Sequence, residues 1–270
     1  LLGLVREVTG NAEDALSAFT SCVELDARFT DGHYHRGLAL VALGRLETAM
    51  DAFDVLLDID PSRYDAWFRE GLILEQFREY EEGLSAFETS LALDPHQPEA
   101  WFHIARCRSG QGRPGEAVEA CEQALEIDPR HAEALTLKGL SEEAIGEREH
   151  ALQSLWKSLG IDPDQPVAWH HRGSVLLSLG RFAEAADSLD HALALVPRNA
   201  GALYQKGLAL EDLGRSGDAI PAFARATELE PGNAPAWFHR GLNLVKDGRP
   251  GDAIHPLEQA LALRKEDPRT

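Results

Sequence analysis

Apolar side chains recur at helical spacing along the whole chain, and residues 98–129 show the pattern well. Within 101–108 and again within 117–125, the apolar positions fall three and four residues apart, so each group shares one face of a helix. Glycine and Pro114 separate the two groups, and Pro114 fits only an opening residue of the second helix. Pro129 ends the unit, because proline and the residue before it cannot continue a helix. The pattern predicts an antiparallel helical hairpin.

The same unit repeats every 34 residues. Glycine fixes the register at Gly3, Gly37, Gly71, Gly139, Gly173, Gly207 and Gly241, and only Ala105 breaks the series. Two further series are Pro61, Pro95, Pro129, Pro163, Pro197 and Pro231, and Ala15, Ala49, Ala117, Ala151, Ala185, Ala219 and Ala253. Glycine inside a helix costs roughly 0.5–1 kcal/mol relative to alanine, so its recurrence implies a packing reason. We predict that the series glycines lie inside the first helices, where a neighbouring helix approaches closely.

A fixed period in this range indicates an array of supersecondary units that each need a neighbour to bury an apolar face. No segment alternates with a period of two over strand length, so the predicted fold class is all-α. We expect one array over residues 1–270. Its repeats span approximately 1–29 (incomplete), 30–63, 64–97, 98–131, 132–165, 166–199, 200–233 and 234–267.

The residues at fixed offsets resemble those of the tetratricopeptide repeat family, whose pattern runs Trp, Leu-Gly, Tyr, Ala, Phe and Pro. The Trp position holds Trp67, Trp101, Trp169 and Trp237, and the Phe position holds Phe19, Phe53, Phe87 and Phe223. The resemblance covers all 270 residues. It implies a right-handed α-solenoid superhelix of antiparallel helix pairs, with ligands in a concave groove lined by the first helices.

Several residues depart from the repeat. Arg78 stands where other repeats have a turn glycine, and Gly83 replaces the alanine of the second helix, so we expect that repeat to be the least regular. Pro221 and Pro256 fall inside second helices, where proline removes an amide donor. We expect those two helices to start late or to bend.

The charge balance narrows the class of partner. The net charge is −19 and the pI is near 4.9, which argues against nucleic acid and anionic membrane surfaces as partners. No apolar run approaches the roughly 20 residues that span a bilayer. The chain begins at Leu1 within a repeat and without methionine, so we expect a fragment of a longer protein. The absence of a signal peptide then decides nothing, and a cytoplasmic location is our expectation.

The resemblance implies that the groove is formed by positions 2, 5, 6, 9, 12 and 13 of each repeat. Position 5 gives an aromatic stripe, which favours either packing between first helices or a row of apolar faces for a partner. The predicted partner-binding residues are Tyr34, His35, Asp65, Phe68, Arg69, Glu99, Phe102, His103, Arg106, Glu133, His170, His171, Tyr204, Gln205, Phe238 and His239.

Acids outnumber bases at these positions. The acids are Glu7, Asp31, Asp65, Glu75, Glu99, Glu133, Glu143, Glu211 and Asp212, and the bases are Arg69, Arg106 and Lys246. Either they form a solvated helix face or they favour a basic or amphipathic segment through electrostatic steering. The family's carboxylate clamp needs Lys at position 5, and no repeat here has it, so we do not expect binding of a chaperone's terminal carboxylate.

Histidine recurs at position 6 in every second repeat, as His35, His103, His171 and His239. First helices two repeats apart are separated by about twice the 8–10 Å helix spacing, too far to share one metal ion. We therefore predict hydrogen-bonding histidines and no metal; a pH-responsive groove is an alternative. The three cysteines show no disulfide framework, and Cys22 and Cys121 are expected in the core.

No catalytic motif is present: the chain has no Gly-x-Ser-x-Gly elbow, phosphate loop or His-Glu-x-x-His helix. We expect no enzyme activity and no cofactor. The leading hypothesis is a protein-interaction scaffold that binds a peptide or helix of a partner in its groove. The alternatives are a scaffold that self-assembles end to end, and a regulatory or substrate-selecting arm of an enzyme whose catalytic domain lies outside this fragment.

Overall fold

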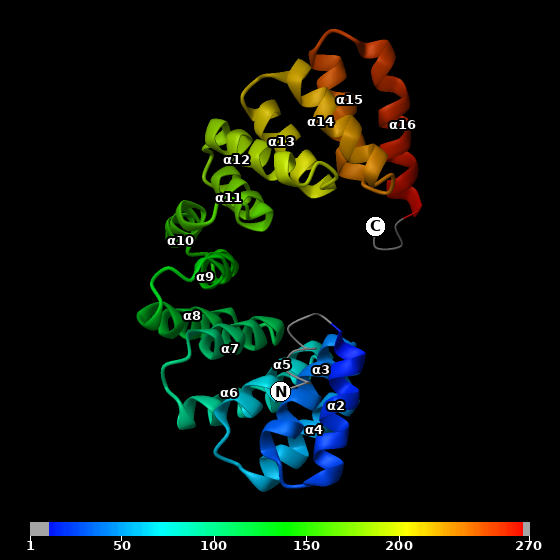
Figure 1. Ribbon diagram of the computed structural model, residues 1–270. Coiled ribbons are helices and arrows are strands. Elements are labelled where there is room, and N and C mark those ends of the chain that lie inside the picture. The colour runs from blue at the N-terminus through cyan, green and yellow to red at the C-terminus, as the bar shows by residue number, and fades with distance from the viewer. Residues whose placement is uncertain (1–10, 267–270) are drawn as a thin grey trace. The chain divides into compact units, whose positions relative to one another are not determined.

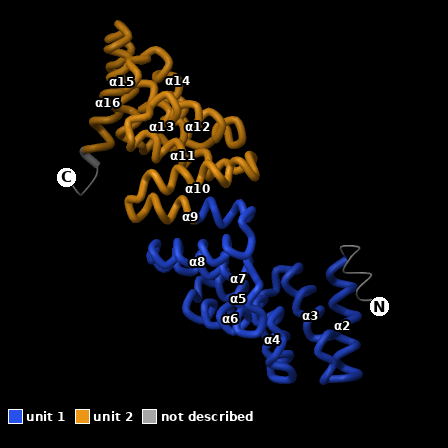
Figure 2. Tube along the Cα trace, turned by 90° about the vertical axis from the view of Figure 1, so that its left-hand side faces the viewer, with its two compact units in different colours: residues 1–137 blue, residues 138–270 orange. Residues whose placement is uncertain are grey.

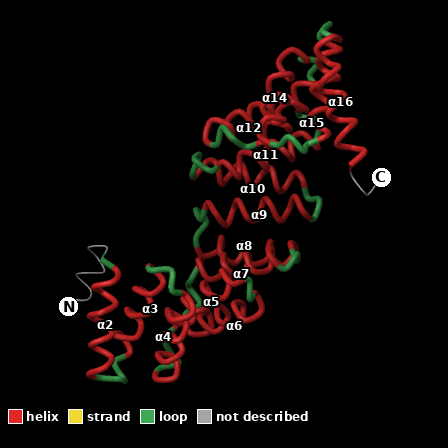
Figure 3. Tube along the Cα trace, turned by 90° about the vertical axis from the view of Figure 1, so that its right-hand side faces the viewer, coloured by secondary structure: helices red, strands yellow, loops and turns green. Residues whose placement is uncertain are grey.

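The protein is an array of helices in the computed structural model, which describes residues 11–266 (Figure 1). Within this range every regular element is a helix and loops join them (Figure 3), so the predicted all-α class is confirmed. The helices are α2 (Ala12–Leu25), α3 (Thr30–Ala42), α4 (Leu46–Ile59), α5 (Tyr64–Phe77), α6 (Tyr80–Leu93), α7 (Pro98–Gly110), α8 (Pro114–Ile127), α9 (Ala132–Ala144), α10 (Arg148–Ile161), α11 (Pro166–Ser178), α12 (Phe182–Leu195), α13 (Ala200–Asp212), α14 (Ser216–Leu229), α15 (Ala234–Lys246) and α16 (Pro250–Glu266).

The helices form two compact units, residues 1–137 and 138–270, with the boundary inside α9 (Figure 2). Within each unit the first helix of a repeat packs mainly against the second helix of the same repeat, as in α5–α6, α7–α8 and α13–α14. Second helices also pack against the next first helix, as in α6–α7 and α14–α15. The predicted hairpin unit is therefore confirmed; the single array over the whole chain stays a prediction.

The repeat glycines lie inside first helices, as predicted, and the structure gives the packing reason. A Cβ on Gly71 would lie 2.6 Å from the Phe87 ring, and a Cβ on Gly139 would lie 2.7 Å from Leu155 Cγ. Such distances are shorter than real Cβ contacts, so only glycine lets the second helix bring its large side chain this close. The same clash, with Phe or Leu 16 residues later, holds at Gly37, Gly173, Gly207 and Gly241; Gly3 lies outside the described residues.

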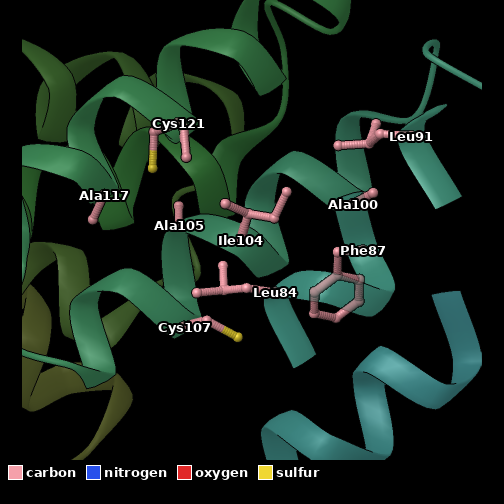
Figure 4. Close-up of a cluster of buried hydrophobic side chains, with 10 residues drawn as sticks. Leu84, Phe87, Leu91, Ala100, Ile104, Ala105, Cys107, Ala117 and Cys121 are labelled. Atoms are coloured by element: carbon pink, nitrogen blue, oxygen red, sulfur yellow. The ribbon is translucent and has the colours of Figure 1, made fainter. Parts of the chain in front are cut away.

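Ala105 breaks the glycine series because its partner is smaller. The residue 16 positions after each series glycine is Phe or Leu, whereas Cys121 follows Ala105. Ala105 and Cys121 are both fully buried in one cluster with Leu84 and Ile104 (Figure 4). A methyl group on the first helix is therefore matched by a smaller side chain on the second, which keeps the local packing volume.

The turn inside each hairpin needs a left-handed residue. Glycine supplies it in six repeats, with φ between 72° and 87°, at Gly44, Gly112, Gly146, Gly180, Gly214 and Gly248. Arg78 takes the same position with φ 64°, the one non-glycine residue at positive φ in the described range. The turn keeps its shape, so the strain of the left-handed conformation falls on the Arg78 backbone.

Two positions of the repeat pattern meet in space. The indole Nε1–H of Trp67 donates to the Pro61 carbonyl at 3.0 Å, and Trp169 and Trp237 donate to Pro163 and Pro231 at 2.8 and 2.9 Å. Each tryptophan thereby ties the start of a first helix to the loop that ends the preceding repeat. The bond uses the backbone carbonyl, so it gives a reason for the tryptophan at these positions and not for the proline.

The expectation of a late start is wrong for both proline-containing helices, and the alternative expectation of a bend stays a prediction. Helix α14 begins at Ser216 and α16 at Pro250, the same repeat position at which α8 begins at Pro114, although Pro221 and Pro256 lie inside them. Pro221 is exposed, so water can reach the carbonyl that lacks its amide donor. The loss of one backbone hydrogen bond costs less free energy than the helix gains by packing against its two neighbouring helices. Among the described helices, none is long and apolar enough to cross a membrane.

Candidate interaction surface on the first helices

The predicted groove residues lie on the first helices, which are α3, α5 and α7 in the first unit, α11, α13 and α15 in the second, and α9, which carries Glu133 and contains the boundary between the units. Contacts between successive first helices join α5 to α7, α11 to α13 and α13 to α15. We call the surface formed by these helices within each unit the first-helix face. Glu7 lies outside the described residues.

The aromatic stripe at position 5 is half-buried. Phe68 packs on the core ring of Phe87 at 5.7 Å between ring centroids, and Tyr204 packs on Phe223 at 5.9 Å. Tyr34 and Phe102 are likewise half-buried, whereas Phe238 is 49% exposed. The rings therefore pack between helices and still present part of their surface, so both alternatives for the stripe have a structural basis.

Histidine and glutamate pair across every second repeat boundary. The Nδ1 atoms of His103, His171 and His239 lie 2.6, 2.7 and 2.8 Å from a carboxylate oxygen 28 residues earlier, on Glu75, Glu143 and Glu211. The acid stands in the last turn of one first helix, and the histidine stands in the second turn of the next. These histidines are hydrogen-bonded, as predicted, and each acts as a tie between two repeats.

Each of these carboxylates has further donors. Arg106 Nε lies 2.9 Å from Glu75, and the Ser174 hydroxyl donates to Glu143 at 3.0 Å. Burial alone would raise the pKa of Glu143, but the hydrogen bonds from His171 and Ser174 outweigh it, and the pKa lies below its ordinary value. The acid is therefore held as a carboxylate.

The pKa of Glu211 lies below its ordinary value for the same reason. Burial opposes the shift, and hydrogen bonds from Lys246, Asn243 and His239 outweigh it. Lys246 Nζ lies 2.7 Å from Oε1 and Asn243 Nδ2 lies 2.8 Å from Oε2.

Three of the position-6 histidines also stack on a core phenylalanine of the preceding repeat. The His103 ring lies on Phe87 and the His239 ring on Phe223, with centroids 5.6 Å apart in both pairs. His35 lies on Phe19 at 5.1 Å. Stacking and hydrogen bonding together fix the ring orientation, so these histidines serve packing first.

Two bases outside the predicted groove positions contact the acids at position 2. Arg63 bonds Asp31 at 2.9 Å and Asp65 at 2.8 Å, and it lies over the Tyr34 ring. Burial would raise the pKa of Asp65, but the Arg63 guanidinium lowers it below the ordinary value. His131 Nε2 lies 2.9 Å from Glu99, and its Nδ1 accepts the backbone amide of Ala134 at 3.3 Å. Arg63 therefore offsets the charge of two acids on this face.

The remaining predicted residues lie apart from these ties. His170 Nε2 and Gln205 Oε1 are buried atoms without a hydrogen-bond partner. Burial, and then the neighbouring His171, lower the pKa of His170, so the neutral ring is favoured there. Arg69 is half-buried on α5.

Sequence reasoning missed Arg63 and His131 because both stand at the last position of a repeat, outside the groove positions that the resemblance implies. A signal for the histidine ties was present: Glu at position 12 and His at position 6 share one 68-residue period, as Glu75, Glu143 and Glu211 with His103, His171 and His239.

The comparisons with known proteins agree with this geometry. Two family models described as tetratricopeptide repeat match the chain, one over residues 74–141 and the other over 1–64, 170–234 and 204–269. A sequence comparison with curated proteins found no relative.

Solved structures with the same fold include three helical-repeat proteins. MamA is 26% identical, with a TM-score of 0.58 over 62% of this chain and 98% of its own. YrrB, described as having an unusual peptide-binding site, is 22% identical, with a TM-score of 0.60 over 70% and 97%. PilF of Pseudomonas aeruginosa is 20% identical, with a TM-score of 0.67 over 76% and 93%.

Proposed function

The chain belongs to the tetratricopeptide repeat family, and from that premise we propose that it is a non-catalytic scaffold that binds a segment of another protein on its first-helix face. The bound segment is a peptide or a helix, basic or amphipathic. The observation that carries the proposal is the stripe of position-5 rings, which are held in place by core contacts and keep part of their surface exposed.

Rigid aromatic rings are effective anchors for a partner because little side-chain entropy is lost when they are covered. Phe68 and Tyr204 are fixed by Phe87 and Phe223 beneath them. Phe238, which is 49% exposed, offers the largest uncovered ring of the stripe. Burial of these surfaces supplies affinity, and the spacing of the first helices sets the register of the segment.

The charge of the face supports a basic or amphipathic partner with one adjustment. Arg63 already pairs with Asp31 and Asp65, so these two acids contribute less attraction than their number indicates. Long-range steering then comes from the net charge of −19, and it falls with ionic strength.

The proposal is tested by selecting binders from a random peptide library on the whole protein and measuring their affinity by calorimetry. We expect selected peptides to carry basic and large apolar residues. Phe238→Ala should weaken a peptide bound in the second unit by about 5- to 150-fold, the effect of losing an anchor.

Trp156→Ala is the matched control, because Trp156 is a 66% exposed aromatic residue on the second helix α10, off the face. It should leave affinity unchanged. Acidic peptides, or binding that depends on Trp156 and not on Phe238, would refute the proposal.

One observation favours self-association as a second function. Ile254 and Leu261 of α16 are 59% and 55% exposed, whereas Leu84 and Leu57, which hold the equivalent positions, are buried. These two side chains form an exposed apolar surface on α16, and we propose that a second copy of the chain covers it. Mass measured against concentration by sedimentation tests this, and a monomer at every concentration would rule it out.

A further inference from the structure

Two arginines break the repeat pattern in neighbouring repeats. Arg78 stands in the hairpin turn at the position that glycine fills in the six other repeats. Arg106 stands at position 9, which holds an uncharged residue elsewhere, namely Leu38, Leu72, Leu140, Ser174, Leu208 and Leu242. Neither substitution follows from the packing of the array, and the first strains the backbone.

Both arginines line one depression of about 440 Å³ in the first unit, where α5 and α7 end and α6 begins. We call this depression the arginine pocket. Its polar lining consists of Glu75, Gln76, Arg78, Tyr80, Arg106 and Ser109. Tyr80 packs directly over Gly110, where an added Cβ would lie 2.5 Å from the ring, so the floor of the pocket is closed by a tight contact.

The two arginines of the pocket differ in their ion-pair partners. Arg106 Nε is held at 2.9 Å by Glu75, a buried carboxylate that also accepts from His103. This bond fixes the direction of the Arg106 side chain. Arg78 is exposed, and within the described part of the chain it has no carboxylate in ion-pairing range. The pocket therefore has two guanidinium groups and one carboxylate, Glu75, which is already bonded to Arg106 and His103.

Three further lining groups can donate a hydrogen bond as well as accept one: the Gln76 amide, the Ser109 hydroxyl and the Tyr80 phenol, beside the apolar side chain of Leu137. The C-terminal ends of α5 and α7 offset part of the positive charge, because helix C-termini carry partial negative charge. Fork-shaped guanidinium donors match a planar carboxylate, with two parallel hydrogen bonds to each group.

We propose that the arginine pocket binds a carboxylate side chain of the partner, so that the segment bound on the first-helix face of the first unit carries an Asp or Glu at this point. The inference rests on the proposed function for the source of the carboxylate. The pocket itself can be tested without any peptide.

The experiment uses the whole protein labelled with ¹⁵N-glycine, in which the Gly110 and Gly112 amides report on the pocket. N-acetylglutamate N-methylamide is titrated at constant ionic strength, with the uncharged N-acetylglutamine N-methylamide as the comparison. We expect saturable shifts at Gly110 and Gly112 with the glutamate compound alone, with a dissociation constant on the order of 10 mM.

Arg78→Gly and Arg106→Leu restore the residues of the other repeats, so both variants should fold. Each should weaken binding by about tenfold or more. Arg130→Gln, which removes an exposed charge on the loop after α8, is the matched control and should leave the titration unchanged.

Equal shifts with the glutamine compound, binding that survives Arg78→Gly, or no shift at either amide would overturn the proposal. Inorganic phosphate that binds tenfold more tightly than the glutamate compound would also overturn it, because the pocket would then select a phosphate. If the glutamate compound binds and no library peptide does, carboxylate binding by the arginine pocket is supported and peptide binding on the first-helix face is refuted.

Discussion

The pairing of Ala105 with Cys121 allows a direct test of the packing rule that sets the repeat. In the other repeats a glycine faces Phe or Leu, and a Cβ on Gly37, Gly71 or Gly207 would lie 2.5–2.6 Å from the facing phenylalanine ring. Cys121→Phe alone should bring a ring to about that distance from the Ala105 Cβ. Overpacking of this kind costs about 1–3 kcal/mol of unfolding free energy.

Ala105→Gly alone should cost about 1–2 kcal/mol, the sum of helix propensity and one lost buried methyl group. The double variant Ala105→Gly with Cys121→Phe rebuilds the pair found in neighbouring repeats. We expect it to recover about 2 kcal/mol relative to the sum of the two single changes, within the range known for residues in direct contact.

The assay is native-state hydrogen exchange on α7 and α8, because repeat arrays open locally and a single global transition does not report one hairpin. Exchange in α13 and α14 serves as the internal reference. Strictly additive losses in the double variant would refute the account, since they would mean that the two side chains do not share one packing volume.

Three further predictions follow from single positions. Arg78→Gly should raise the free energy of opening the α5–α6 hairpin by about 1 kcal/mol by removing left-handed strain, and faster hydrogen exchange in α5 and α6 would contradict this. Gly83→Ala should stabilise the same hairpin by about 0.5–1 kcal/mol, because its Cβ would meet only ordinary contacts at 3.5 Å. Gly71→Ala should destabilise it by about 1–3 kcal/mol, and hydrogen exchange measures both changes. Burial, and then Asp54, raise the pKa of Glu70 to about 7. Ionisation of Glu70 therefore lowers the unfolding free energy. This loss is absent below a pH of about 4.5, the pKa of an ordinary glutamate, and is complete above a pH of about 7. Glu70→Gln should therefore stabilise by roughly 1–2 kcal/mol near pH 8, allowing for partial solvent screening, and have no effect near pH 4; equal gains at both pH values would count against it.

The fold could be predicted from the sequence because its determinants are local and periodic. The glycine register and the hairpin turns depend on one residue type at one offset, and the structure confirms both at Gly71 and Gly112. The late start expected for α14 was wrong because a single proline was weighed without the packing around it. Sequence rules give the free-energy cost of the hydrogen bond lost at Pro221, but they do not give the packing energy that offsets it.

The candidate site could be predicted only in part. The described residues of the predicted groove lie on first helices, and their role in binding stays a prediction, because the charge of this face depends on contacts between repeats. Arg63 reaches two acids on successive first helices, and His131 bonds Glu99 on the preceding first helix. Such bonds join residues that are 2 to 32 positions apart, so a count of charges at fixed repeat positions cannot reveal which of them are already neutralised.

The histidine–glutamate ties occur at alternate repeat boundaries, with His103, His171 and His239. Arg63 joins the two repeats at the boundary before the first of these ties, and His131 joins those at the boundary between the first two ties. These two kinds of contact lie at opposite ends of the first helices. Removing one repeat, residues 98–131, would set Glu75 opposite Leu137, whereas removing residues 98–165 would set Glu75 opposite His171. For the histidine–glutamate pairs, the module by which this array can be lengthened, shortened or recombined is therefore four helices, twice the unit that the glycine series marks.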